Sequence, residues 1–160
     1  MKKLSVNLVF VIIFIMIQCQ TESNRFSSAE RTWITLVEAA RQNDIKTFVS
    51  GIDLVPTFQA MGYSEKDIDI LVKTIRDRIE DSKFDELKTN MAGFMKIFTK
   101  ANFVILGEEQ AGVNMRLLLV KSIPKAGSNL RESMDKWYFT KRDNKWLLSP
   151  DLTAAKTGYY

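Results

Sequence analysis

The sequence of 160 residues predicts an α+β domain in which N-terminal helices pack on a curved antiparallel β-sheet. Apolar residues recur at helical spacing as far as Lys100, and after it they follow a period of two. Helices therefore precede strands, an order typical of a β-meander with one face covered by helices. A chain of this length can bury the core of one domain, and it contains no internal repeat.

The expected helices lie between residues 27 and 100. Ser27 and Glu30 have the spacing of a capping box and begin a helix that runs to about Gln42, and a short helix follows over 45–50. Ser64 begins a third helix. Its apolar stripe is Ile68, Leu71, Val72, Ile75 and Ile79, and its opposite face carries Asp69, Lys73, Arg76, Asp77 and Glu80. Ser82 begins the last, whose stripe includes Phe84, Leu87, Met91, Phe94, Met95 and Phe98.

The expected strands span 103–107, 113–121, 132–141 and 146–149. Residues 109–112 read as a turn, and strand 113–121 is apolar on both faces, which is typical of a central strand covered on both sides. Residues 142–145 form a hairpin turn, because Asp and Asn tolerate positive φ. If this turn is tight, Trp137 and Trp146 lie nearly opposite or diagonal to each other.

The N-terminus has the parts of an export signal. Lys2 and Lys3 form a basic start, residues 4–17 are almost wholly apolar, and a polar stretch follows. An uncleaved membrane anchor is the alternative, although the apolar run is shorter than the roughly 20 residues that span a bilayer. Cys19, the single cysteine, stands at the switch from apolar to polar residues.

A cysteine at this junction resembles a bacterial lipoprotein signal, although Gln18 stands where such signals usually have a small residue. The resemblance implies that Cys19 is lipidated, becomes the mature N-terminus and holds the protein on a membrane of the cell envelope. The expected organisation is a signal peptide over 1–18, a tether over 19–26, one domain over 27–150 and a tail over 151–160.

Composition excludes several classes of function. The formal net charge of +4 includes Lys2 and Lys3, so the remainder is too weakly basic to suggest nucleic acid. The chain has no histidine, which excludes serine–histidine triads and the commonest metal ligand. One cysteine cannot form a thiolate zinc cluster. We therefore expect no metal, no cofactor and no catalytic constellation.

Three segments carry a resemblance to a known superfamily: 38–48, 111–115 and 137–148. They resemble the first helices, the entry to the central strand and the closing hairpin of exported nuclear transport factor 2-like proteins. The resemblance implies a cone-shaped, cystatin-like fold over about residues 28–150 with a pocket inside. The superfamily includes ketosteroid isomerases and dehydratases with an acid–base pair in the cone. No carboxylate of this sequence matches their motifs, so no catalytic residue is carried over.

Three groups of residues are candidates for a site, each with two interpretations. The first group either lines a cavity for an apolar ligand or simply fills the core. Its members are large apolar side chains: Trp33, Phe94, Phe98, Met115, Trp137, Phe139 and Trp146. Arg116 would bind an anion at a pocket mouth, or pair with an acid on a neighbouring strand. The third group either attracts anionic lipid headgroups near a membrane or belongs to a solvated turn. Its members are the cations Lys136, Lys141, Arg142 and Lys145.

Two classes of function follow. The leading one is a non-enzymatic lipoprotein domain, held at a membrane by lipid on Cys19, that binds a protein or a small apolar ligand. The alternative is an enzyme of the ketosteroid-isomerase type that uses a buried Asp or Glu with a Tyr. A buried carboxylate with a raised pKa, facing an enclosed cavity, would favour the enzyme.

Overall fold

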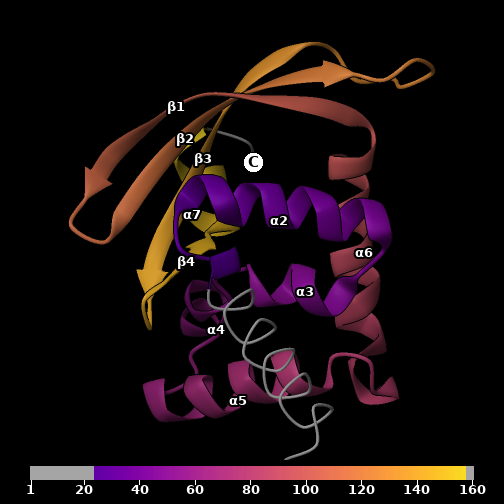
Figure 1. Ribbon diagram of the computed structural model, residues 1–160. Helices are drawn as coiled ribbons and strands as arrows, with labels where there is room; N and C mark the ends of the chain where they lie inside the picture. The colour runs from indigo at the N-terminus through magenta and orange to yellow at the C-terminus, as the bar shows by residue number, and fades with distance from the viewer. Residues whose placement is uncertain (1–23, 158–160) are drawn as a thin grey trace, which may run out of the picture.

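A computed structural model describes residues 24–157 of the protein (Figure 1). Helices come first and a four-stranded antiparallel sheet follows, in the order β1-β2-β3-β4. The predicted α+β class, with helices packed on a curved sheet, is confirmed. The predicted signal peptide and Cys19 lie outside the described residues.

The helices before the sheet are α2 (Ala29–Gln42), α3 (Ile45–Ser50), α4 (Val55–Ala60), α5 (Glu65–Arg78), the 3₁₀ turn η1 (Ser82–Phe84) and α6 (Asp85–Thr99). Ser64 caps α5 as predicted, by accepting a hydrogen bond from the Asp67 amide. The predicted capping of the first helix is wrong by one residue. Ser28 caps α2, because Ser27 instead donates its hydroxyl to the carbonyl of Asn24.

The strands are β1 (Ala101–Gly112), β2 (Met115–Pro124), β3 (Ser133–Arg142) and β4 (Lys145–Leu148). The turn expected at residues 109–112 is wrong, because these residues continue β1 past two irregularities in its pairing with β2. The chain reverses at residues 113–114 instead. The predicted hairpin turn of β3 and β4 is confirmed, with Asp143 and Asn144 at φ 48° and 61°.

The hairpin does not bring the two tryptophans together as expected. Its two-residue turn sets Trp146 opposite Lys141, and the last pair that β4 makes joins Leu148 to Phe139. Trp137 lies beyond that pair and faces Leu118 of β2. The turn is as tight as expected, but the numbers of its paired residues sum to 287, so position 137 corresponds to position 150, beyond the end of β4.

The core lies between one face of the sheet and the helices α2, α3, α5 and α6. Leu118, Phe139 and Leu148 are fully buried on the sheet side. The second face of the sheet is not covered to the same extent, since Val104 and Leu106 remain 45% and 47% exposed. Leu117 and Leu119 of the central strand β2 are half-buried on this second face, so the strand predicted to be covered on both faces is buried on one and partly covered on the other.

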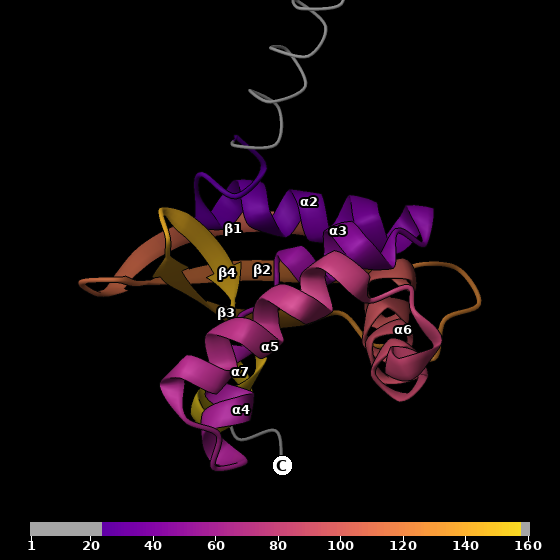
Figure 2. The ribbon, with the colours of Figure 1, turned by 90° about the horizontal axis from the view of Figure 1, so that it is seen from below.

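The domain extends past both of the boundaries predicted for it. Phe26, assigned to the tether, is buried, and its carbonyl accepts the Trp146 amide at 2.8 Å. The expected tail begins with a helix, α7 (Pro150–Thr157), where Thr153 Oγ1 accepts the Tyr138 amide of β3 at 3.0 Å. Figure 2 shows α7 beside α4, and a hydrogen bond of 2.7 Å between Thr57 and Asp151 joins these helices.

Candidate functional site

The aromatic residues that were candidates for a ligand cavity pack mainly against one another. The Trp33 ring lies 5.2 Å from Phe98 and 5.0 Å from Trp137, and Phe94 lies 5.3 Å from Phe98. Phe139 is fully buried in the same core. These contacts match the interpretation in which the rings fill the core rather than line an empty cone.

Arg116 lies over the ring of Trp146 on the sheet, apart from the aromatic cluster around Trp33. The Nε of Arg116 lies 3.4 Å from a carboxylate oxygen of Glu108, so this arginine pairs with an acid on the neighbouring strand. Its guanidinium also lies 5.3 Å from the centre of the Trp146 ring, and the Lys141 amine lies 5.9 Å from it. Met115 is partly buried and pairs with Thr140, and it belongs neither to the aromatic cluster nor to the Arg116–Trp146 contact.

A buried carboxylate that the sequence prediction missed, that of Asp53, lies behind the β3–β4 hairpin. The segment between α3 and α4 holds it there, because the Asp53 amide donates to the Leu148 carbonyl at 2.7 Å. The side chain of Asp53 is 0% exposed. Its sequence signal was an acid between two apolar residues, Ile52 and Leu54.

Both oxygens of Asp53 are occupied by donors from its own chain. Arg142 Nε lies 2.9 Å from each oxygen, Thr140 Oγ1 donates to Oδ2 at 2.5 Å, and the Val55 amide donates to Oδ1 at 3.2 Å. The hydrogen-bonding capacity of this buried carboxylate is therefore met within the chain. Arg142, expected in a solvated turn, therefore fixes the hairpin to the helical layer.

Arg76 of α5 lies close to this pair. Its Nη2 donates to the carbonyl of Ile52 at 3.2 Å, while its Nε is buried without an acceptor in the described part of the chain. Burial lowers the pKa of Arg76, and the charge of Arg142 adds to this, while the charges of Asp53 and Asp143 act in the opposite direction. Arg76 was assigned to the solvent-facing side of its helix, so the sequence prediction missed it.

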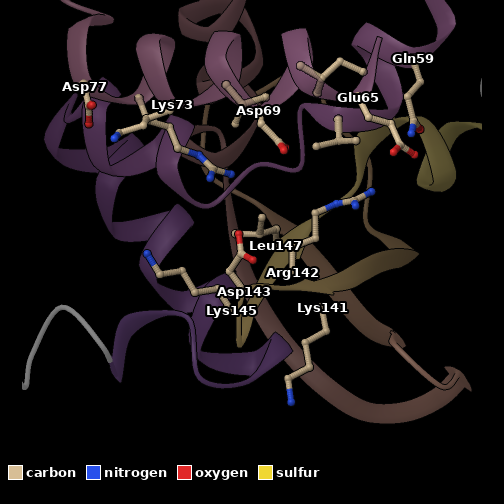
Figure 3. Close-up of a pocket in the computed structure, with 14 residues that line it drawn as sticks. Gln59, Glu65, Asp69, Lys73, Asp77, Lys141, Arg142, Asp143, Lys145 and Leu147 are labelled. Carbon is tan, nitrogen blue, oxygen red and sulfur yellow. The ribbon is translucent and has the colours of Figure 1, made fainter. Parts of the chain in front are cut away.

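Arg76 lines a groove of about 670 Å³ between α5 and the β3–β4 hairpin, here called the α5–hairpin groove (Figure 3). Its volume falls within the range of small-molecule sites. Most of its lining is charged, with Glu65, Asp69, Lys73, Arg76 and Asp77 from α5 and Lys141, Arg142, Asp143 and Lys145 from the hairpin. The structure thus brings together three cations of the predicted cationic group, and Lys136 does not line the groove.

A second hollow, of about 460 Å³, lies between α5 and η1. Tyr63, Ile70, Leu71 and Phe84 give it a largely apolar lining. Ile70 is 59% exposed, and the Tyr63 ring packs against Phe58 at 5.8 Å. This hollow therefore has an apolar lining where the α5–hairpin groove has a charged one. Leu71 and Phe84 were predicted from periodicity to belong to the apolar stripes of their helices, and both line the hollow.

Residues 24–157 contain neither a group of potential metal ligands nor a long apolar helix. Within this range, no group of three or more acidic side chains is placed to hold a metal ion. Asp53 has no free oxygen to act as a general base, because its own chain supplies donors to both oxygens. None of the described helices combines the length and the apolar composition needed to cross a bilayer. No protein-family model matches the chain, and comparisons with curated proteins and with solved structures found no match.

Proposed function

We propose that this protein is an exported, lipid-anchored domain that binds a protein partner in the α5–hairpin groove and catalyses no reaction. The observation that carries the proposal is the groove itself, where charged side chains of both signs surround a half-buried arginine. Mixed charges around one buried anchor suit recognition of a polar chain segment, because charge complementarity gives specificity.

The proposed anchor is lipid on Cys19. Its support is the sequence: a basic start, an apolar run and a single cysteine where polar residues begin. Two or more acyl chains would hold the domain stably, whereas one chain binds a membrane only marginally. The proposed likeness to nuclear transport factor 2-like proteins rests on the three sequence segments and on helices that precede a curved sheet.

Enzymatic activity of the ketosteroid-isomerase type has less support. Such an enzyme needs a carboxylate with a free oxygen facing a substrate cavity. Asp53 is the buried carboxylate of the described core, but Arg142, Thr140 and Val55 occupy its oxygens. The aromatic rings that would line a cone cavity contact one another instead.

Site-specific cross-linking in cells that naturally make the protein tests the proposed function. A photo-reactive residue at Gln59, in the groove wall, should give a discrete adduct in the membrane fraction. The same residue at Met134, which is 71% exposed on β3 and outside the groove, is the matched control and should give none. No adduct from Gln59, or equal adducts from both positions, would contradict the proposal.

The apolar hollow favours a second candidate, the binding of a small apolar ligand. An environment-sensitive apolar dye should brighten with the protein, and Ile70→Asp should abolish this by placing a charge in the lining. Ile34→Asp on α2 is the control, because Ile34 is 43% exposed outside the hollow. Equal dye binding by both variants would rule the hollow out as the site.

A further inference from the structure

Arg76, at the floor of the α5–hairpin groove, has no ion-pair partner at contact distance among the described residues. The Asp53 carboxylate accepts hydrogen bonds from Arg142 rather than from Arg76, and Asp53 and Asp143 act on Arg76 only from a distance. Among the described residues, no carboxylate lies within 4.0 Å of the Arg76 guanidinium. A partly buried charge without a partner is costly, and a ligand anion would offset that cost.

Arg76 is also short of hydrogen-bond acceptors. Its one hydrogen bond within the described chain goes to the Ile52 carbonyl, and its Nε is buried with no acceptor. Native proteins satisfy most buried donors, so an unsatisfied one calls for an explanation. A carboxylate accepts two parallel hydrogen bonds from a guanidinium, so it is the kind of acceptor that Arg76 lacks.

The rim of the groove limits the charge of the ligand. Lys73 and Lys145 would attract an anion, but Glu65, Asp69 and Asp77 would repel one with several negative charges. Figure 3 shows Asp69 and Lys73 on α5 across the groove from Asp143 and Lys145 on the hairpin. This arrangement favours a single negative charge at the floor, with neutral or basic groups around it.

We infer that the α5–hairpin groove is a receptor for a peptide carboxylate, which binds to Arg76 at its floor. The inference rests on the proposed function and names the chemistry of the partner segment. A C-terminal carboxylate and an acidic side chain share this chemistry. Arg76 is the positioning cation of the site, and the rim acids exclude polyanions.

Nuclear magnetic resonance of the full chain in a nonionic detergent tests the inference directly. The Arg76 Nε–H signal should shift saturably with N-acetylalanine, which mimics a C-terminus, or with N-acetylglutamic acid α-amide, which mimics a side chain. The stronger of the two identifies the source of the carboxylate. Inorganic phosphate should bind at least about fivefold more weakly, because the rim acids repel it. The absence of a saturable shift with both carboxylates, or equal binding of phosphate, would overturn the inference.

Arg76→Lys is the decisive variant, with Arg78→Lys as its matched control on the same helix. Lysine keeps the charge but loses the planar fork, so carboxylate affinity should fall about tenfold when followed at the Asp143 amide. Arg78 pairs with Asp81 at 2.7 Å and its side chain is 60% exposed, so its replacement should leave affinity unchanged. Equal affinity in both variants would contradict the assignment of Arg76.

Rim variants keep the test decisive if Arg76→Lys does not fold. Lys73→Gln and Lys145→Gln alter exposed side chains, and each should weaken carboxylate binding about two- to fivefold through the lost attraction. Unchanged affinity in both would contradict the site. A Gln59 adduct without carboxylate binding would overturn the ligand class alone, whereas carboxylate binding without any adduct would leave the receptor and overturn the protein partner.

Discussion

At the scale of single residues, Asp53 decides how the hairpin and the helical layer meet. Its carboxylate accepts hydrogen bonds from β3 through Thr140 and Arg142 and from the start of α4 through Val55. Because Asp53 is hydrogen-bonded to Arg142, Arg76 has no carboxylate at ion-pair distance, and Asp53 and Asp143 act on it only from a distance. The same carboxylate therefore stabilises the fold and prepares the groove for an anion.

Asp53→Asn should lower the free energy of unfolding by about 3 kcal/mol, because it leaves the Arg142 charge without its partner. Asp81→Asn removes the Arg78 ion pair at the surface and should cost less than about 1 kcal/mol. Urea denaturation of the two variants measures the difference. Equal losses would mean that the buried pair contributes no more than a surface one.

A pH dependence is expected at Asp44, the N-cap of α3. Burial alone would raise the pKa of Asp44, but its hydrogen bonds to Thr47 and the charge of Arg25 outweigh burial, and the pKa is lowered below 3.8. The ionised group thus adds stability above pH 3.8, and this stability is lost as the pH falls through the lowered pKa.

Asp44→Ala should accordingly cost about 1 kcal/mol at pH 7 through the lost cap, and the loss should shrink below about pH 3.8. Asp44→Asn keeps an oxygen acceptor without a titrating charge and should lose less at neutral pH. Denaturation curves from pH 7 to pH 3 compare the variants. A loss for Asp44→Ala that grows as the pH falls would contradict the assignment.

At the scale of elements, the β3–β4 hairpin links the core to the groove. Trp146 is 8% exposed beneath Arg116 and Lys141, and the next two residues of β4, Leu147 and Leu148, are buried. Lys145, at the start of the strand, and Leu147 line the α5–hairpin groove. The short strand β4 therefore contributes residues both to the core and to the lining of the groove.

Trp146→Ala should destabilise the domain by about 3–5 kcal/mol, because it removes a large buried ring. Lys145→Ala, at the adjacent position, should change stability by less than about 0.5 kcal/mol. Chemical denaturation of both proteins measures the contrast. A loss below about 1 kcal/mol for Trp146→Ala would show that the ring is not a core residue.

At the scale of the whole molecule, fold class was predictable from sequence and the candidate site was not. Helical and strand periodicities are local, so they located α5, α6 and the hairpin turn. Arg76 has the sequence position of a solvent-facing residue, and tertiary neighbours in the segment before α4, such as the Ile52 carbonyl, partly bury it. Ile52, Asp53 and Leu54 have no local periodic pattern, because their hydrogen bonds reach Leu148 and Arg142, far along the chain.

The two boundary errors have a similar origin. Phe26 belongs to the domain through its buried side chain and through its carbonyl, which accepts the Trp146 amide, and α7 belongs to it through contacts with β3 and α4. Neither segment has a strong periodicity of its own, so tertiary contacts decide its conformation. A stable folded unit should therefore need residues 24–157 rather than 27–150.

Mass spectrometry of the protein purified from its native membranes tests most directly the claim that this is a lipid-anchored domain. We predict an N-terminal fragment that begins at Cys19, lacks residues 1–18 and carries the added mass of two or more acyl chains. Cys19→Ala should leave the unprocessed, heavier polypeptide without acyl mass. An unmodified Cys19 in the native protein, or unchanged processing in the variant, would contradict the account.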